Sequence, residues 1–454
     1  MTDFPSPEFQ GRPAETFNEA EDALLSRWPE TKLEPSLDRI EAFTELLGRP
    51  QDAYPVIHLT GTNGKTSTSR MIDTLLHALN LRTGRFTSPH VEKMSERISV
   101  DGEPLTDEQF VQAFNDVAPY MPLVDASEDH PLSFFEAVVG MAYAAFADAP
   151  VDVAVVEVGM GGSWDATNVM DAAVAVVLPI SVDHSKYLGD TAVEIAREKA
   201  GIIKPGSFTV LGAQQAAAAE ILLARVGEVG ATLARQGIEF GVRHREMAVG
   251  GQLLTLQGLA DTYEDVFLPL HGEHQAGNAA MALAAVEAFA GGGREGLDPE
   301  AVRAAFARVT SPGRLEALRR GPVVLVDAAH NPAGAAALAT ALNDEFASTT
   351  LVAVVAVLAD KDAVGILEAL EPAVEALVVT TNSSPRSMPA ADLARVARDV
   401  FGEDRVFQAS PLPEAIDVGL ALAEREASFG GHGVIVTGSV VTAGDARAAF
   451  GVAS

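Results

Sequence analysis

The spacing of apolar residues predicts alternating helices and strands along the chain. Helical patterns run from Ala20 to Trp28 and from Leu37 to Leu47, and an apolar run from Tyr54 to Thr60 predicts a buried strand. Thr66 to Leu79 predicts a helix, because its apolar residues recur every three or four positions. Residues 1 to about 20 are polar and Pro-rich, and we expect them to be mobile.

Two later apolar runs indicate strands that are covered on both faces. Val151 to Val158 and Val174 to Val182 are rich in valine and do not alternate strictly. Helical segments separate them, and Phe208 to Leu211 predicts one more strand, so the pattern favours a mostly parallel sheet flanked by helices. Residues 236–272 alternate and contain turn signals, which predicts a small β excursion before an Ala-rich helix from Gln275 to Ala290.

The alternation of predicted strands and helices begins again after residues 311–313, a Ser-Pro-Gly turn. A second alternating series then predicts strands at 323–326, 351–357, 377–380 and 434–437. We therefore expect an α/β protein with two domains. Residues 1–311 would form the larger one, and residues 312–454 a smaller, Rossmann-like α/β domain.

Composition narrows the class of protein. The 454 residues include 63 acidic and 32 basic side chains, for a formal charge of −31, and no cysteine. This charge argues against nucleic-acid binding, which needs a basic face, and the lack of cysteine removes disulfides and thiolate chemistry. The N-terminus lacks the regions of a signal peptide, and no apolar stretch approaches about 18 residues, so we expect a cytoplasmic protein with no membrane segment.

The strongest local motif is the octapeptide TGTNGKTS at residues 60–67, between a predicted strand and a predicted helix. Glycines let backbone N–H groups face phosphate oxygens, and the helix N-terminus adds positive potential. Leu59 stands where the strict P-loop pattern has its first glycine, and the alternative is a turn that binds nothing. We predict that this segment, with Gly61, Thr62, Asn63, Gly64, Lys65 and Thr66, binds phosphate groups, with Lys65 at the terminal phosphates and the Thr66 hydroxyl at Mg²⁺.

Two further side chains follow the ends of predicted strands. Glu157 ends the first Val-rich run, and His184 follows the second. Ligands collect at the carboxyl ends of parallel strands, so both would share one rim with Lys65 and could hold a divalent ion, Mg²⁺ in view of the oxygen ligands. The alternatives are a solvated strand end for Glu157 and a capping or core histidine for His184.

Lys199 lies on the apolar stripe of a predicted helix at residues 190–201. A lysine in the last turn suits the helix dipole, and its stem can lie along apolar surface while the amine reaches water. Burial would instead push the amine toward neutrality. A neutral amine can add carbon dioxide to form a carbamate, an anionic oxygen ligand.

With these features, the chain resembles the folylpolyglutamate synthase/dihydrofolate synthase family of the Mur ligase superfamily. The resemblance runs from about residue 30 to about residue 445. Its motifs, in order, are TGTNGKTS at 60–67, TSPH at 87–90, FFE at 134–136, VEVGMGG at 156–162, DATN at 165–168, DH at 183–184, EIAREKAGI at 194–202, HQAGN at 274–278, PGRLE at 312–316, DAAHNP at 327–332, LADKD at 358–362 and TGS at 437–439.

The resemblance implies a fold and a reaction. The larger domain would be of the P-loop type, and the smaller would be a glutamate-ligase domain. The enzyme would use ATP and Mg²⁺ to turn a carboxylate into an acyl phosphate, which the amine of L-glutamate then attacks. Its acceptors would be dihydropteroate, tetrahydrofolates or both, and the family is commonly monomeric.

The resemblance also implies site residues. Mg²⁺ would bind Ser88, Glu157, His184 and a carbamylated Lys199, besides Thr66. Asn278 would contact the adenine, Arg314 the phosphates, Asp327 the ribose and His330 the reacting phosphate. The pterin or folate pocket would be shaped by Ser133, Phe134, Phe135, Glu136, Trp164, Asp165 and Ala166. Family members often have glycine where Ala328 stands and arginine near Ser163.

Taken without the resemblance, several of these residues also have a purely structural interpretation. Arg314 could be a surface charge at a hinge, Asp327 and His330 could cap a helix, and Asn278 could solvate one. The run of residues 360–362 is expected to be a solvated helix start. The rival functions are a cell-wall Mur ligase, a P-loop kinase and a non-catalytic nucleotide-binding module.

Overall fold

The computed structural model describes residues 11–29, 35–426 and 431–452. The expectation of a mobile N-terminal stretch falls, for residues 1–10, outside the described part. It is wrong for the residues from Phe17, where helix α1 (Phe17–Leu25) begins. The Thr16 side chain accepts a hydrogen bond from the backbone of Glu19, which caps this helix.

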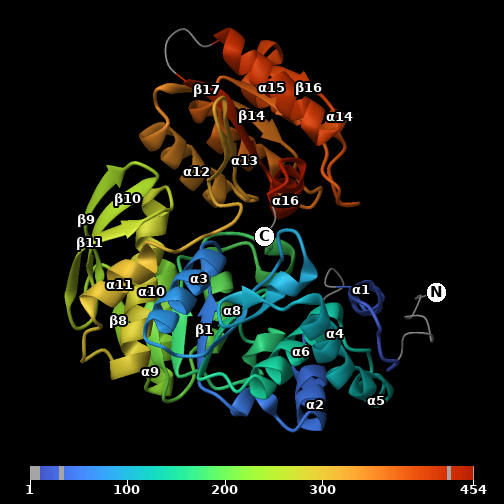
Figure 1. Ribbon diagram of the computed structural model, residues 1–454, viewed down its shortest axis with the longest axis vertical. Coiled ribbons are helices and arrows are strands. Elements are labelled where there is room, and N and C mark those ends of the chain that lie inside the picture. The colour runs from blue at the N-terminus through green and yellow to red at the C-terminus, as the bar shows by residue number, and fades with distance from the viewer. Residues whose placement is uncertain (1–10, 30–34, 427–430, 453–454) are drawn as a thin grey trace.

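In the described part, eight strands form a large sheet in the order β4-β3-β2-β5-β1-β6-β7-β8 (Figure 1). The strands from β2 to β8 in this order are parallel, and β3 and β4 extend the sheet antiparallel at one edge. The bounds are β1 (Val56–Thr60), β2 (Thr83–Phe86), β3 (Ile98–Val100), β4 (Glu103–Pro104), β5 (Val153–Glu157), β6 (Val174–Val177), β7 (Phe208–Leu211) and β8 (Thr232–Arg235).

Helices cover both faces of this sheet, so its central strands β2, β5, β1 and β6 are buried throughout. Along β5, Val153 and Val155 pack into one core, while Ala154 and Val156 face the other. The first core is covered by α3 (Lys65–Ala78), α10 (Glu273–Gly291) and α11 (Pro299–Phe306). The opposite face carries α1, α2 (Asp38–Leu46), α4 (Asp107–Val117), α6 (Phe134–Asp148), α8 (Ala192–Lys199) and α9 (Ala216–Val229).

The predicted β excursion is confirmed as a separate three-stranded antiparallel sheet. It consists of β9 (Gly241–Ala248), β10 (Gly251–Gln257) and β11 (Thr262–Leu268). Leu254, Leu256 and Val266 of this sheet pack into the same core as α10. The sheet therefore extends the wall that α10 forms beside residues 60–67, here called the phosphate loop.

Residues from Glu316 onward form a third sheet, with the order β12-β13-β17-β14-β15-β16. Only β12 is antiparallel to its neighbour. The strands are β12 (Glu316–Arg320), β13 (Val323–Val326), β14 (Thr349–Val355), β15 (Ala376–Val379), β16 (Val406–Gln408) and β17 (Gly431–Thr437). One face carries α12 (Pro332–Glu345), α13 (Ala363–Leu370) and α14 (Ala390–Phe401), and the other α15 (Leu412–Glu426) and α16 (Val440–Ala449).

The predicted fold class is thereby confirmed: a mostly parallel sheet flanked by helices, and a second, smaller α/β unit (Figure 1). We propose that the domain boundary lies at residues 311/312. In support, each side of this point has its own sheet and its own apolar cores. Below, the N-terminal part means residues up to 311 and the C-terminal part the residues after it.

The strand predicted over Val174 to Val182 is too long. β6 ends at Val177, and Pro179, which has no N–H to donate to a ladder, begins a loop. This loop contacts the phosphate loop instead, because the Thr62 amide donates to the Pro179 carbonyl at 3.2 Å and Ser181 donates to the Thr62 hydroxyl at 2.9 Å. Across the described ranges, none of the helices combines the length and apolar character that crossing a bilayer demands.

Candidate active site

Two adjoining cavities lie between the N-terminal and C-terminal parts. The first, here called the phosphate cavity, has a volume of about 1110 Å³ and is lined by residues 61–67 of the phosphate loop and by Asp327. The second, the acceptor cavity, has a volume of about 920 Å³. The two share lining residues from both parts, among them Ser88, His184 and His330. A group bound in one cavity can therefore reach a group bound in the other.

The phosphate loop connects β1 to α3, as the motif predicts. Gly64 has φ +86°, in the left-handed region that favours glycine. A β-carbon at this position would lie 2.7 Å from Oδ1 of Asn278, so the loop also needs glycine for its close contact with α10. Asn278 lines the phosphate cavity and donates to Oε1 of Gln275 at 3.1 Å. Its side chain is thus placed beside the phosphate loop.

Lys65 is the first residue of α3 and lines the phosphate cavity. Its ammonium group donates to the carbonyl of Gly61 at 2.9 Å and to that of Thr62 at 3.3 Å. Burial lowers its pKa. A desolvated cation at a helix N-terminus is suited to phosphate oxygens.

Glu157 lies behind the phosphate loop rather than in a cavity. Its carboxylate is fully buried and lines neither cavity. It accepts hydrogen bonds from the hydroxyl of Thr66 at 3.1 Å and from that of Ser69 at 2.5 Å. In this arrangement Glu157 orients Thr66, and the Ser69 contact was not anticipated from the sequence.

Thr66, Ser88, His184 and Lys199 all line the phosphate cavity. Burial lowers the pKa of His184 to about 4, so its imidazole is neutral near pH 7 and has a free lone pair to offer. Within the described ranges, no cluster of three or more acidic or histidine side chains is arranged for a metal ion. The residues fit Mg²⁺ held jointly with phosphate oxygens, because this ion keeps few protein ligands when it binds with a nucleotide.

Lys199 ends α8, and its side chain is buried as the apolar stripe predicts. Its amine donates to the carbonyl of Gly61 at 3.1 Å and to the hydroxyl of Thr60 at 3.4 Å. Burial and then the charge of Lys65 lower its pKa to about 7. A large fraction of the amine is therefore neutral near pH 7, as carbamate formation requires.

On the C-terminal wall, Asp327 organises the turn that carries Arg314. Its carboxylate accepts hydrogen bonds from the backbone N–H groups of Leu315 and Ala329, both at 2.8 Å. Leu315 has φ +44°, a conformation in which these bonds help to hold it. Asp327 and Arg314 both line the phosphate cavity. Burial raises the pKa of Asp327, although the charge of Arg314 opposes this.

His330 borders both cavities. Its Nδ1 lies 2.9 Å from the carbonyl oxygen of Ala328, and as an N–H it donates to it. Its Nε2 lies 3.8 Å from Oδ2 of Asp183. Burial lowers the pKa of His330 to about 4, so the ring is neutral near pH 7. This tautomer leaves Nε2 as an acceptor between the two cavities.

Asp183, Asn331 and Lys361, for which the sequence predicts no role, join the two walls. Lys361 lies 3.0 Å from Oδ1 of Asp183, and Asn331 donates to Oδ2 of Asp183 at 2.9 Å. Asn331 and Asn63 of the phosphate loop exchange hydrogen bonds at 3.1 and 3.2 Å. Burial raises the pKa of Asp183. His184, which is protonated in the acid range where Asp183 titrates, and Lys361 outweigh burial and hold this pKa well below its usual range.

The expectation of a solvated helix start at residues 360–362 is wrong for Lys361. Its side chain is only 10% exposed, because the N-terminal part covers it. Asp360 is exposed, as expected, and it forms an ion pair at 2.6 Å with Arg386, which also lines the acceptor cavity.

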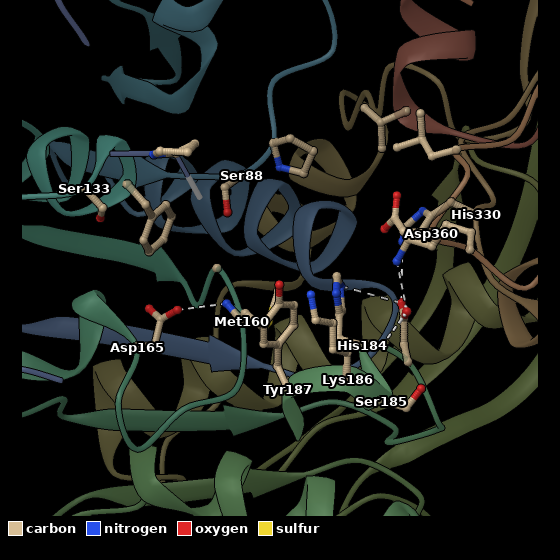
Figure 2. A pocket seen from close by; sticks show the side chains of 18 of the residues that line it. Ser88, Ser133, Met160, Asp165, His184, Ser185, Lys186, Tyr187, His330 and Asp360 are labelled. Carbon is tan, nitrogen blue, oxygen red and sulfur yellow. Dashed lines mark hydrogen bonds and ion pairs between the residues drawn. The ribbon is translucent and has the colours of Figure 1, made fainter. Parts of the chain in front are cut away.

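The acceptor cavity is elongated, with Ser133 and Asp165 at one end and His330 and Asp360 at the other (Figure 2). Of the residues expected in the pterin or folate pocket, six line it: Ser133, Phe135, Glu136, Trp164, Asp165 and Ala166. Phe134 does not, and it packs in the core with Arg97 over its ring. In α6, Phe135 and Glu136 face the cavity, whereas Phe134 points into the apolar core beneath it.

Two acidic residues of this cavity have structural partners. Glu136 forms a buried ion pair with Arg39 at 3.0 Å and closes the capping box of α6 with Ser133. Asp165 accepts from the backbone of Met160 at 2.8 Å, a bond visible in Figure 2. Burial raises the pKa of Asp165. Both carboxylates therefore shape the cavity wall.

Comparisons with known proteins agree with this geometry. Residues 123–286 match the Mur ligase middle domain, and residues 313–440 match the Mur ligase glutamate ligase domain. The dihydrofolate synthase/folylpolyglutamate synthase of Mycobacterium tuberculosis is 53% identical over 455 residues, covering 95% of this chain and 93% of the relative. The folylpolyglutamate synthase of Lacticaseibacillus casei is 36% identical over 355 residues, covering 78% and 83%.

Solved structures are similar as well. The M. tuberculosis folylpolyglutamate synthase complexed with ADP superimposes with a TM-score of 0.92 at 52% identity, covering 96% of this chain and 98% of that chain. A structure described as an FPGS–AMPPCP–folate complex gives a TM-score of 0.82 at 32% identity, with 95% and 98% covered.

Proposed function

This chain belongs to the dihydrofolate synthase/folylpolyglutamate synthase family of Mur ligases, and we propose that the boundary between its two cavities is where ATP activates a folate-type carboxylate. The protein is an ATP-dependent ligase that adds L-glutamate in folate metabolism. ATP is its co-substrate, and Mg²⁺ accompanies the nucleotide. The resemblance in the sequence is confirmed.

The observation that carries this proposal is the contact between the phosphate loop and the DAAHNP turn. The hydrogen bonds between Asn63 and Asn331 join these segments, which are 268 residues apart in sequence. A triphosphate on the loop would extend toward His330, which also lines the acceptor cavity. The two reactants would thus be held end to end, which removes much of the entropic cost of bringing them together.

The proposed reaction has two steps. A carboxylate oxygen of the acceptor attacks the γ-phosphorus, an O–P bond forms, and the bond to ADP breaks. The amine of glutamate then attacks the acyl carbon and loses a proton, and phosphate leaves. Lys65 and Arg314 offset negative charge on the transferring group, and bound Mg²⁺ would add positive charge there. The neutral Nε2 of His330 would accept a hydrogen bond from the incoming amine.

We also propose individual roles for the residues of the phosphate cavity. Thr66, Ser88 and His184 would hold Mg²⁺ together with phosphate oxygens, and Glu157 would act mainly through Thr66. Lys199 would be carbamylated, which is supported by its burial, its lowered pKa and its place in the cavity wall. Asn278 would contact the adenine, and Asp327 the ribose. Monomeric state, a cytoplasmic location and the lack of a nucleic-acid partner remain proposals.

The proposed function is tested by offering acceptors separately. The protein is incubated with ATP, Mg²⁺ and L-glutamate together with dihydropteroate, tetrahydrofolate or a UDP-linked cell-wall precursor, and phosphate release and product mass are measured. We expect glutamate-dependent phosphate release and a product heavier by one glutamyl residue with at least one pterin acceptor. Ligation on the cell-wall precursor alone would indicate another Mur ligase. Phosphate release that needs no glutamate would indicate a kinase or ATPase, and nucleotide binding without turnover would indicate a binding module.

A further inference from the structure

Arg447 is a buried cation at the junction of the two parts and lines neither cavity. It lies on α16, which faces the N-terminal part (Figure 1). Its side chain is 3% exposed. Its Nε donates to Oε1 of Glu92 at 2.6 Å, and its Nη1 donates to Oε1 of Glu316. One guanidinium group thus joins a loop of the N-terminal part to the first strand of the C-terminal part.

The Glu92 side of this contact leads to Ser88. The loop between them is tied by Glu96, whose carboxylate accepts from the amides of Val91 and Glu92, each at 2.9 Å, and from a third, at Lys93. On the other side of Ser88, the amide of Thr87 donates to the carbonyl of Arg97 at 3.0 Å, so the loop that carries Ser88 into both cavities is tied at both ends, and fixing Glu92 fixes one of them.

The helix also approaches the same loop directly. A β-carbon on Gly444 of α16 would lie 2.2 Å from the carbonyl oxygen of Val91. Only glycine permits this approach, so the contact between α16 and the loop is a close backbone contact as well as an ion pair.

The Glu316 side leads to Arg314. The second carboxylate oxygen of Glu316 accepts from the amide of Gly313 at 2.8 Å. Gly313 has φ +68°, and Leu315 is held in its positive-φ conformation by Asp327. The turn that presents Arg314 to the phosphate cavity is therefore held from both sides, by Glu316 and by Asp327.

We propose that Arg447 is a positioning residue that fixes Ser88 and Arg314 relative to each other when the two parts dock. The inference rests on the proposed function, because it concerns the geometry of the same reaction. Without Arg447, two largely buried carboxylates would be left close together without their shared cation, and their repulsion would separate the loop from the turn. Lysine cannot replace it, because a single ammonium group lacks the planar fork that reaches both carboxylates.

The test compares Arg447→Lys with Arg27→Lys. Arg27 is a similarly buried arginine, paired with Asp125 at 2.6 Å, and it lines neither cavity. We expect Arg447→Lys to lower kcat by about 10-fold to 100-fold, since small misplacements of reacting groups have effects of this size. We also expect it to weaken the calorimetric Kd for Mg²⁺–ADP by about 10-fold. Arg27→Lys should change the melting temperature but neither kcat nor the Kd for Mg²⁺–ADP.

A second variant keeps the test decisive if Arg447→Lys does not fold. Glu92→Gln retains an oxygen that can accept from Arg447 and removes one of the two carboxylates, so it should fold and shift the nucleotide Kd in the same direction by a smaller factor. Wild-type kcat and Kd in both variants, or equal shifts in Arg27→Lys, would overturn the role of Arg447. Failure of the wild-type protein to ligate glutamate would instead overturn the proposed function.

Discussion

Replacing Lys65 with alanine is expected to lower kcat for glutamate ligation by about 10³-fold, the scale seen when a charge that stabilises the transferring phosphoryl group is lost. The ammonium group now donates to two loop carbonyls, and phosphate oxygens would take their place. Because negative charge on the transferring group must be offset during transfer, the loss should fall on kcat more than on the KM for ATP. Steady-state phosphate release at saturating substrates measures it.

Folding and folate binding are the controls for Lys65→Ala. Lys65 does not line the acceptor cavity, so the Kd for folate in the absence of nucleotide should be unchanged. A thermal unfolding curve close to that of the wild type would show that the variant is folded. A folded variant that retains wild-type kcat would contradict the assignment of this loop as the binding site of the ATP phosphates.

Replacing Lys199 with alanine is expected to lower kcat by about 10²-fold or more, with partial recovery on adding acetate or formate. The lysine is buried against the phosphate loop, so alanine leaves space beside Gly61 that a small carboxylic acid can enter. If the working side chain is a carbamate, such an acid supplies the missing oxygen ligands. The measurement is kcat as a function of acid concentration at constant ionic strength.

Lys204→Ala is the matched control for this rescue. Lys204 is also a partly buried lysine, and its ammonium group donates to the carbonyls of Asn168 at 2.8 Å and Met170 at 2.6 Å, outside both cavities. Small acids should not change its activity. Full activity in Lys199→Ala, or the same response to acids in both variants, would contradict the carbamate.

Local pattern was enough to predict the framework of the site. The TGTNGKTS motif between a strand and a helix indicates the loop from local sequence alone. The strand ends bring His184 to the cavity beside this loop, whereas Glu157 lies behind the loop and reaches it through Thr66. The stripe of α8 likewise predicted the burial of Lys199, because periodicity reports which face of a helix is covered.

Contacts between distant segments could not be predicted in this way. Glu92 and Arg447 are 355 residues apart, and nothing in the sequence around a charged residue states which partner the folded chain will supply. The same holds for Lys361. The sequence around it is typical of a solvated helix start, but in the folded chain it is buried against Asp183. Phe134 was misplaced for a different reason, since a motif of adjacent residues does not state which of them faces the cavity.

In the proposed reaction, the two cavities bring a carboxylate and the γ-phosphate of ATP together to form an acyl phosphate. This reaction is tested most directly by labelling the acceptor carboxylate with heavy oxygen and analysing the released phosphate by mass spectrometry. We expect each phosphate to carry one heavy oxygen, because the oxygen that attacks phosphorus leaves with it when the amide forms. Unlabelled phosphate, released with formation of the glutamyl product, would contradict it.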